Sequence, residues 1–212
     1  MGPLNRTGRN RSRAGPHPRT RPPACAIGRD DVKHDQIARD ADIRAERITL
    51  RPLRPSDAAP ITAQAGDLRV ARGTKSIPHP YPPGTAEALI ASAHAPDRMR
   101  DVWVIDGSGH GWGEVVGLVA LTRLDRAQSE VSYWVAPDYW NTGIASEALR
   151  ALIAANPQGA QTYFAEAFQD NPGSARVLTN CGFDYLGDAE AFSRARGAVA
   201  PTWTYTLRIA AA

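Results

Sequence analysis

Apolar and polar residues alternate in short runs between residues 43 and 209, and this alternation predicts the strands of a sheet. Residues 47–53 alternate as a half-buried strand does. Residues 101–106 and 114–122 are β-rich runs joined by a glycine-containing loop, as in an antiparallel hairpin. Four further strands are predicted at residues 129–135, 162–167, 184–191 and 203–209.

Two helix-like runs lie between the first strand and residue 100. Residues 57–71 follow a helical pattern, and Ser56 or Asp57 can serve as the N-cap. Residues 85–94 form the second run, with Thr85 as its cap. Helices interspersed among strands predict a mixed α/β fold.

A proline-rich segment, residues 77–84, separates these two helices. Its four prolines exclude regular structure and predict a rigid loop. Such a loop holds its side chains outwards or into a cleft.

A tight turn at Asn141, Thr142 and Gly143 follows the strand at 129–135, and an Ala- and Leu-rich helix over 144–155 begins at once. Glycine lets the backbone approach a ligand, and the free N–H groups of a helix start form a pocket for phosphate oxygens. The turn lacks the three glycines of the dinucleotide fingerprint and the lysine of the P-loop. The pattern therefore predicts another kind of phosphate site.

A last helix is predicted after the strand at 162–167. Asn171 can cap this helix, its first turn tolerates Pro172, and Gly182 can end it. Because the strands at 129–135 and 162–167 are joined through a helix, they can run parallel.

Residues 1–42 differ from the rest of the chain, and we interpret them as a disordered arm that precedes a single domain at 43–212. Residues 1–29 carry seven arginines and no acid. The remaining 18 basic and 22 acidic residues leave a net charge of −4, against +3 for the whole chain. An Arg-rich arm can bind nucleic acid through phosphates, but an accessory tail or an over-extended start of the reading frame is the simpler interpretation.

Composition excludes several classes of protein. The hydrophobic content of 42% predicts a soluble domain with a core, and no apolar run is long enough for a membrane span. With only two cysteines, Cys25 and Cys181, the sequence predicts no structural disulfide, which suits a reducing cytoplasm. The five histidines show no metal-ligand spacing, so we expect no metal site.

The turn at residues 140–145 resembles the pyrophosphate-binding signature Q/R-x-x-G-x-G/A of the GNAT superfamily of N-acetyltransferases. Tyr-Trp before a glycine turn and Ala-Ser-Glu-Ala after it resemble the RimJ/RimL-like branch, as does the segment Asn171 to Phe183, which matches Asn-x-x-Ser-x-x-Val-Leu-x-x-x-Gly-Phe. Trp140 stands where the signature has Gln or Arg, and Asn141 where the branch usually has Gly. The resemblance covers about residues 46 to 209.

This resemblance implies the GNAT fold, a mixed and mostly antiparallel sheet with a splayed central strand pair and flanking helices. Acetyl-CoA would lie in the split, its pantetheine arm pairing with the backbone and its pyrophosphate resting on the turn. The residues implied in binding acetyl-CoA are Trp134, Val135, Trp140, Asn141, Thr142, Gly143, Ile144, Ala145, Ser146, Asn171 and Ser174.

The resemblance also suggests catalytic roles for an acyltransferase. Glu130, in a strand facing the cleft, is the first candidate for the base, and Glu166 is the second; a solvated strand residue is the alternative for Glu130. Many GNAT enzymes carry, at the position of Leu178, a Tyr that protonates the departing thiolate. Leucine cannot donate a proton. Ser174 is then the candidate hydrogen-bond donor to the CoA sulfur. The alternative for Ser174 and Asn171 is a role only at the helix N-terminus.

The acceptor is expected to be a primary amine of a protein N-terminus or a small molecule. A lysine amine has a pKa of about 10.4 and an α-amine one of about 8, so an α-amine requires a weaker base at pH 7. His79 and Tyr81 border the acceptor pocket in the family and are candidates for substrate contact, with packing as the alternative. A non-catalytic acyl-CoA-binding or RNA-associated module is the rival interpretation, and monomer and homodimer both remain open.

Overall fold

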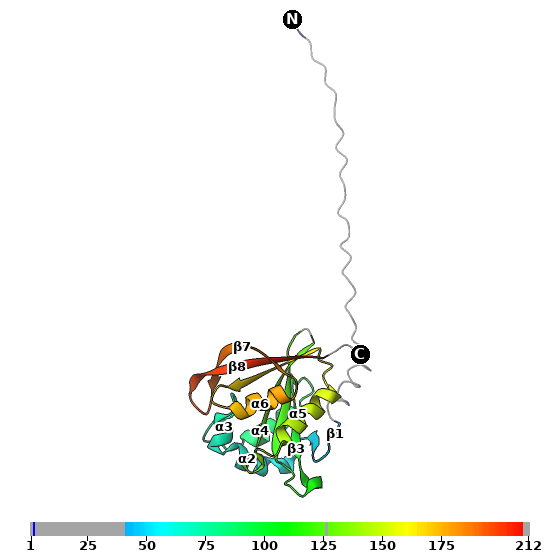
Figure 1. Ribbon diagram of the computed structural model, residues 1–212, viewed down its shortest axis with the longest axis vertical. Coiled ribbons are helices and arrows are strands. Elements are labelled where there is room, and N and C mark those ends of the chain that lie inside the picture. Colours follow the sequence, from blue (N-terminus) through cyan, green and yellow to red (C-terminus); the bar gives the residue numbers. More distant parts are fainter. Residues whose placement is uncertain (1, 3–40, 126, 210–212) are drawn as a thin grey trace.

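A computed structural model of the chain describes residues 2, 41–125 and 127–209 (Figure 1). The predicted arm, residues 1–42, lies outside these residues except for positions 2, 41 and 42. Cys25 is likewise outside, and Cys181 is a free thiol.

The described residues form an eight-stranded sheet with the order β1-β2-β3-β4-β5-β6-β8-β7. All neighbouring strands are antiparallel except β5 and β6, which run parallel. This topology confirms the predicted mixed, mostly antiparallel sheet. The strands are β1 (Ile43–Arg44), β2 (Thr49–Pro52), β3 (Arg100–Asp106), β4 (Gly117–Arg123), β5 (Gln128–Val135), β6 (Thr162–Phe168), β7 (Asp184–Ser193) and β8 (Ala198–Arg208).

The parallel pair β5 and β6 separates along its length. Backbone partners are present only at Gln128 with Thr162, Ser129 with Tyr163 and Glu130 with Phe164. Beyond these pairs, β5 continues beside β4 and β6 beside β8. The sheet is therefore open in its middle, as the predicted splay requires.

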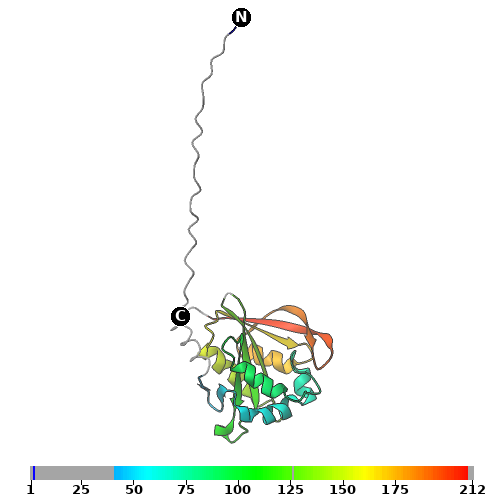
Figure 2. The same cartoon turned by 180° about the vertical axis from the view of Figure 1, so that it is seen from behind.

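Helices cover both faces of the sheet. Helices α5 and α6 lie on the face seen in Figure 1, and α4 lies on the opposite face, seen in Figure 2. The helical elements are η1 (Pro55–Asp57), α2 (Ala58–Ala65), α3 (Leu68–Arg72), α4 (Thr85–Ala93), η2 (Ser108–His110), η3 (Pro137–Tyr139), α5 (Ile144–Ala155) and α6 (Pro172–Asn180).

Each face has its own apolar core. Leu149 and Leu178 pack from the side of α5 and α6 against the sheet, in a cluster that includes Tyr163. Ile61 of α2 and Ile90 of α4 belong to the second cluster, on the other face. Burial of these side chains holds the helices in place, so the position of the split between β5 and β6 is fixed from both sides.

The prediction of one continuous helix over 57–71 is wrong. Helix α2 ends at Ala65, and Asp67 has an extended backbone (ψ 124°) and starts α3 by accepting a hydrogen bond from the Arg69 N–H. Gly66 lies between the two helices, where glycine has a weak preference for the helical state. The chain therefore changes direction between α2 and α3.

The predicted caps also differ from the observed ones. Thr85 is the first residue of α4 and not its cap, because Gly84 occupies the N-cap with a φ of +78°. Asp57 precedes α2 but its side chain makes no cap hydrogen bond to that helix. Its carboxylate is engaged elsewhere.

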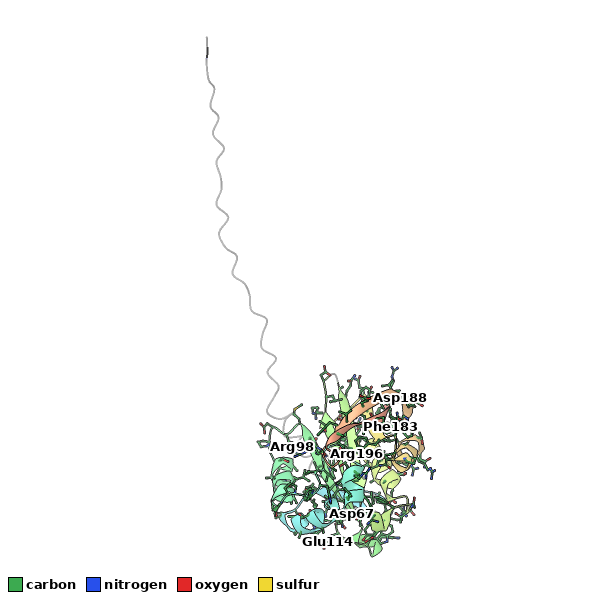
Figure 3. The ribbon with its side chains drawn as sticks, turned by 90° about the vertical axis from the view of Figure 1, so that its left-hand side faces the viewer. Asp67, Arg98, Glu114, Phe183, Asp188 and Arg196 are labelled. Atoms are coloured by element: carbon green, nitrogen blue, oxygen red, sulfur yellow. The ribbon has the colours of Figure 1, made fainter. Side chains whose placement is uncertain are left out.

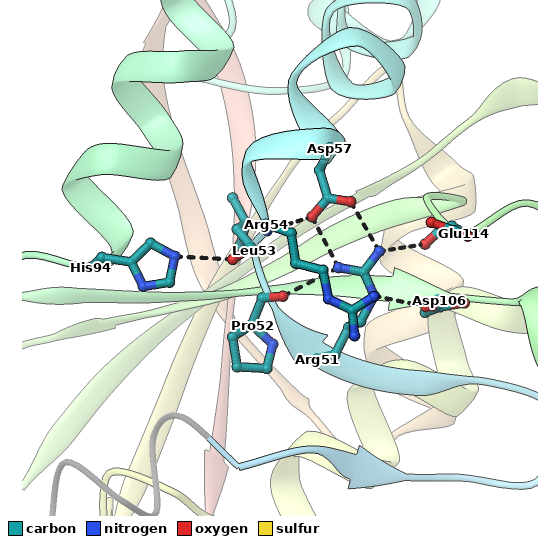
Figure 4. Close-up of polar contacts among 8 residues, drawn as sticks. All are labelled: Arg51, Pro52, Leu53, Arg54, Asp57, His94, Asp106 and Glu114. Atoms are coloured by element: carbon teal, nitrogen blue, oxygen red, sulfur yellow. Dashed lines mark hydrogen bonds and ion pairs between the residues drawn. The ribbon is translucent and has the colours of Figure 1, made fainter.

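Asp57 binds the buried guanidinium of Arg51 (Figure 4). Two hydrogen bonds of 2.9 Å join the groups, and both side chains are only 2% exposed. Arg51 Nε also donates to Asp106 at 2.7 Å. Burial opposes the charge on Arg51, but the two carboxylates outweigh it and raise the pKa of Arg51 above its ordinary value. This cluster joins β2, η1 and β3.

Replacing Asp57 by Ala should lower the free energy of unfolding by about 3–5 kcal/mol, because it leaves a buried guanidinium short of one of its two carboxylates. Urea denaturation measures the change. Asp170→Ala is the matched control, since it breaks an Arg pair whose carboxylate is 55% exposed and should cost no more than about 1 kcal/mol. Equal losses in the two variants would contradict a special role for the buried pair.

Candidate functional site

The turn before α5 has the backbone geometry of an anion site. Asn141 has a φ of +64° and Gly143 one of +86°, so both residues occupy the left-handed region. Asn adopts this region more readily than other non-glycine residues, which explains why Asn141 can stand where glycine is usual. Gly143 is the N-cap of α5, and no side chain caps that end. The first N–H groups of α5 are thus available to an anion.

Arg47 holds this turn from a distant part of the chain. Its backbone N–H and its Nε donate to the two carboxylate oxygens of Glu147 at 2.7 Å each, and its Nη1 donates to the Thr142 carbonyl at 3.0 Å. Glu147 lies in the first turn of α5. The sequence carries no signal for this contact, because Arg47 and Glu147 are 100 positions apart.

A groove of about 870 Å³ begins at the turn and runs along the ends of β5 and α6. Trp140 lies in it and donates its indole N–H to the Val135 carbonyl at 2.7 Å. The groove is rich in basic side chains, which suits an anionic ligand. The residues lining it include four arginines, Arg69, Arg72, Arg176 and Arg196, and one acid, Asp170.

A second cavity, of about 390 Å³, lies at the α2 and α4 face of the sheet. Apolar side chains such as Ile61, Leu89 and Phe168 form much of its wall. Glu130 and Glu166 contribute carboxylates. A mostly apolar cavity with a few convergent charged groups is typical of a small-molecule site.

The groove and the cavity meet where β5 and β6 separate. Five residues line both spaces: Gly73, Thr74, Tyr133, Trp134 and Ser174. A ligand in the groove and another in the cavity can therefore come into contact at this junction.

The two carboxylates proposed from the sequence as bases lie together and share one partner. Lys75 Nζ donates to Glu130 and, at 2.8 Å, to Glu166. Burial disfavours the charge on Lys75, but the carboxylates outweigh this effect and raise its pKa. Lys75 could not be identified from the sequence, because it precedes the proline-rich loop in a segment with no motif.

Ser174 lies beside the hydroxyl of Tyr133, another residue that sequence analysis did not assign. The two hydroxyl oxygens are 3.0 Å apart, and the Ser174 N–H donates to the Asn171 side chain at 3.2 Å. Burial raises the pKa of Tyr133 well above its ordinary value, although the hydrogen bond with Ser174 acts in the opposite direction. Tyr133 therefore stays protonated and can donate a hydrogen bond. Leu178 is fully buried in the core, away from this junction.

Of the remaining predicted residues, all except His79 and Thr142 line the cavity or the groove. Tyr81 lines the cavity, whereas His79 does not; its ring faces the Gly66 carbonyl at 3.1 Å. Thr142 is directed back into the turn, since its hydroxyl donates to the Tyr139 carbonyl at 2.6 Å. The other residues predicted to bind the cofactor all line the groove: Trp134, Val135, Trp140, Asn141, Gly143, Ile144, Ala145, Ser146, Asn171 and Ser174.

The β7–β8 hairpin fixes the segment that carries Lys75. The Arg194 N–H donates to the Lys75 carbonyl at 3.1 Å, and the Ser193 hydroxyl donates to the Thr74 carbonyl at 3.3 Å. Arg196, labelled in Figure 3, donates to the Arg72 carbonyl and to Asp170. The backbone at the junction is thus tied to the C-terminal hairpin.

Two features are absent from the described residues. No group of three or more His, Cys, Asp or Glu side chains is arranged to hold a metal ion there. No helix in that part of the chain is long and apolar enough to cross a membrane.

Comparison with known proteins gives one family match. Residues 47–184 match the model of the acetyltransferase (GNAT) domain. No curated protein matches the sequence.

Solved structures share the fold at low sequence identity. RimL, a ribosomal L7/L12 α-N-protein acetyltransferase in complex with coenzyme A, has a TM-score of 0.68 and 14% identity, over 80% of this chain and 98% of that one. The microcin C7 self-immunity acetyltransferase MccE, with acetyl-CoA and AMP, has a TM-score of 0.67 and 15% identity over 77% and 93%. Spermidine N-acetyltransferase from Vibrio cholerae, with CoA and spermine, has 0.63 and 18% over 76% and 95%. These similarities confirm the predicted fold.

We expect the Tyr133 phenol to remain protonated beyond pH 10, because burial disfavours the phenolate. Carbon-13 NMR of protein labelled at the tyrosine ζ carbon measures this, with Tyr133→Phe assigning the resonance. A Tyr133 titration midpoint near the ordinary value of about 10 would contradict the expectation.

Proposed function

Because the chain belongs to the GNAT family of acetyltransferases, we propose that it transfers the acetyl group of acetyl-CoA to a primary amine. The observation that carries this proposal is the junction of the groove and the cavity at the split between β5 and β6. One space suits an anionic, elongated ligand and the other a compact acceptor. Among the described residues, the groove and the cavity share only the residues of this junction. A thioester in the groove and an amine in the cavity would have to meet there.

The residues of the groove fit acetyl-CoA. The uncapped N–H groups at the start of α5, after Gly143, suit a pyrophosphate, and the arginines at the groove add positive charge. The Val135 carbonyl already accepts the Trp140 indole N–H. The pantetheine arm would pair with the backbone groups of β5 near Trp134 and Val135 that neither this bond nor β4 occupies.

When bound, acetyl-CoA supplies a thioester: the amine nitrogen forms a bond to its carbonyl carbon, the C–S bond breaks, and the sulfur leaves as a thiolate. Glu130 would accept a proton from the attacking amine, directly or through water. The hydroxyl of Ser174, held by Tyr133, would donate a hydrogen bond to the departing sulfur. A thiol of pKa about 8.5 leaves as a thiolate with little need for protonation. A hydroxyl can therefore take the place of the Tyr phenol that many GNAT enzymes have at the position of Leu178.

Gly143→Val should lower the affinity for acetyl-CoA at least tenfold, measured by calorimetry. A β-branched side chain is strained at a φ of +86° and would crowd the amides that face the phosphates. Gly84→Val is the matched control, because Gly84 is also the N-cap of a helix, with a φ of +78°, but lies outside the groove. It should lose stability similarly and keep its affinity. Failure of the wild-type protein to bind acetyl-CoA would refute the proposed function.

Glu130→Gln should lower kcat by about 10²–10⁴-fold while leaving the affinity for acetyl-CoA unchanged, because an amide cannot accept the amine proton. Release of CoA thiol measures the rate, with the best acceptor from a panel of α-amine peptides and small primary amines. Glu190→Gln, an exposed residue of β7, serves as the control. A kcat equal to wild type in Glu130→Gln would remove Glu130 from the mechanism. A non-catalytic acyl-CoA-binding module would bind acetyl-CoA and release no thiol with any amine.

A further inference from the structure

We propose that Glu130 and Glu166 form the ammonium subsite of the acceptor cavity, that the side chain of Lys75 fills this subsite in the present structure, and that the acceptor is a compact primary monoamine. This inference rests on the proposed function and names its substrate class. It also gives Lys75 a role, as an internal competitor of the acceptor.

The first support is the arrangement of the two carboxylates. They come from different strands, β5 and β6, yet converge on a single nitrogen, Lys75 Nζ. The side chains of Glu130 and Glu166 are 29% and 27% exposed, so a ligand in the cavity can reach them. Two carboxylates that converge on one cation form a binding site for any cation of the same shape.

The second support is the chemical identity of the group that fills the subsite. The end of the Lys75 side chain is itself a primary alkylammonium, the class of group that an amine acceptor presents. Its side chain is 39% exposed, and ion pairs at such exposure are weak. The Lys75 backbone is held by Arg194, so the flexible side chain can withdraw while the loop stays in place.

A buried hydroxyl gives an independent sign that the cavity takes a polar ligand. Thr202 lines the cavity, is 1% exposed, and its Oγ1 has no hydrogen-bond partner among the described residues. A buried polar atom without a partner costs free energy unless a ligand satisfies it. Thr202 pairs with Phe168 of β6, two residues beyond Glu166, so its hydroxyl lies close to the proposed subsite.

The other charges of the cavity restrict the acceptor to one ammonium group. Arg100 and Arg194 also line the cavity, and both carry positive charge. Among the described residues the cavity has no carboxylate besides Glu130 and Glu166, so a second ammonium would face guanidinium groups. The volume of about 390 Å³ and the apolar wall favour a compact body. A polyamine fits this charge pattern poorly.

The test is a calorimetric titration of n-butylammonium into the full-length protein saturated with CoA. Lys75→Met and, separately, Lys75→Gln should bind the probe at least fivefold more tightly than wild type, because the internal competitor is gone. Arg194→Met is the matched control: it also removes one cation from the cavity, but not the one bound to the carboxylates, and should change the affinity less than twofold. Adding Glu166→Gln to either Lys75 variant should reverse the gain.

Unchanged or weaker binding of n-butylammonium in both Lys75 variants would overturn the proposal, as would an equal gain in Arg194→Met. Spermidine serves as the second probe, and wild-type binding tenfold tighter than that of n-butylammonium would overturn the restriction to monoamines. Thermal melting and CoA affinity are measured for every variant. Failure of the wild-type protein to bind CoA would instead contradict the proposed function. The failure of the subsite proposal and the failure of the proposed function are therefore distinguishable.

Discussion

Backbone pairing between β5 and β6 ends at Glu130 and Phe164, and the groove and the cavity meet where the two strands diverge. A fully paired sheet would satisfy these backbone groups and leave no passage between its faces. The helices on the two faces, packed on separate apolar cores, hold the strands apart. The split thus connects the face that carries the arginine-lined groove with the face that offers carboxylates.

Arg51, Arg47 and Lys75 are among the cations that bridge distant parts of this chain, and they differ in burial. Arg51 is 2% exposed and is bound by Asp57 and Asp106, so it is a permanent part of the fold. Arg47 has an intermediate exposure of 29% and fixes the turn before α5. Lys75 is the most exposed of the three, at 39%, and its pairs are the easiest to break. Solvent access therefore increases from the buried pair of Arg51, through the pair of Arg47 at the turn, to the pairs of Lys75 in the cavity.

The phenol at the junction of the groove and the cavity comes from β5 and not from α6. Leu178 is committed to the core, so that helix offers no phenol. Tyr133 approaches from β5 instead, and its hydroxyl lies beside that of Ser174 at the first turn of the helix. A hydroxyl pair that joins a strand to a helix also helps to fix the distance between them.

Elements with a local cause could be predicted from the sequence. Alternation predicted seven of the eight described strands but not β1, and the glycine turn with its helix predicted an anion site, because positive φ angles and free helix N–H groups are properties of a few consecutive residues. Local propensity failed at Gly66 and Asp67, where it did not predict the break between α2 and α3. Three contacts arise from tertiary packing alone: Arg47 holds the turn, Tyr133 meets Ser174, and Lys75 lies between Glu130 and Glu166. Each of these contacts joins residues at least 41 positions apart, and such proximity is created by packing and leaves no periodic trace in the chain.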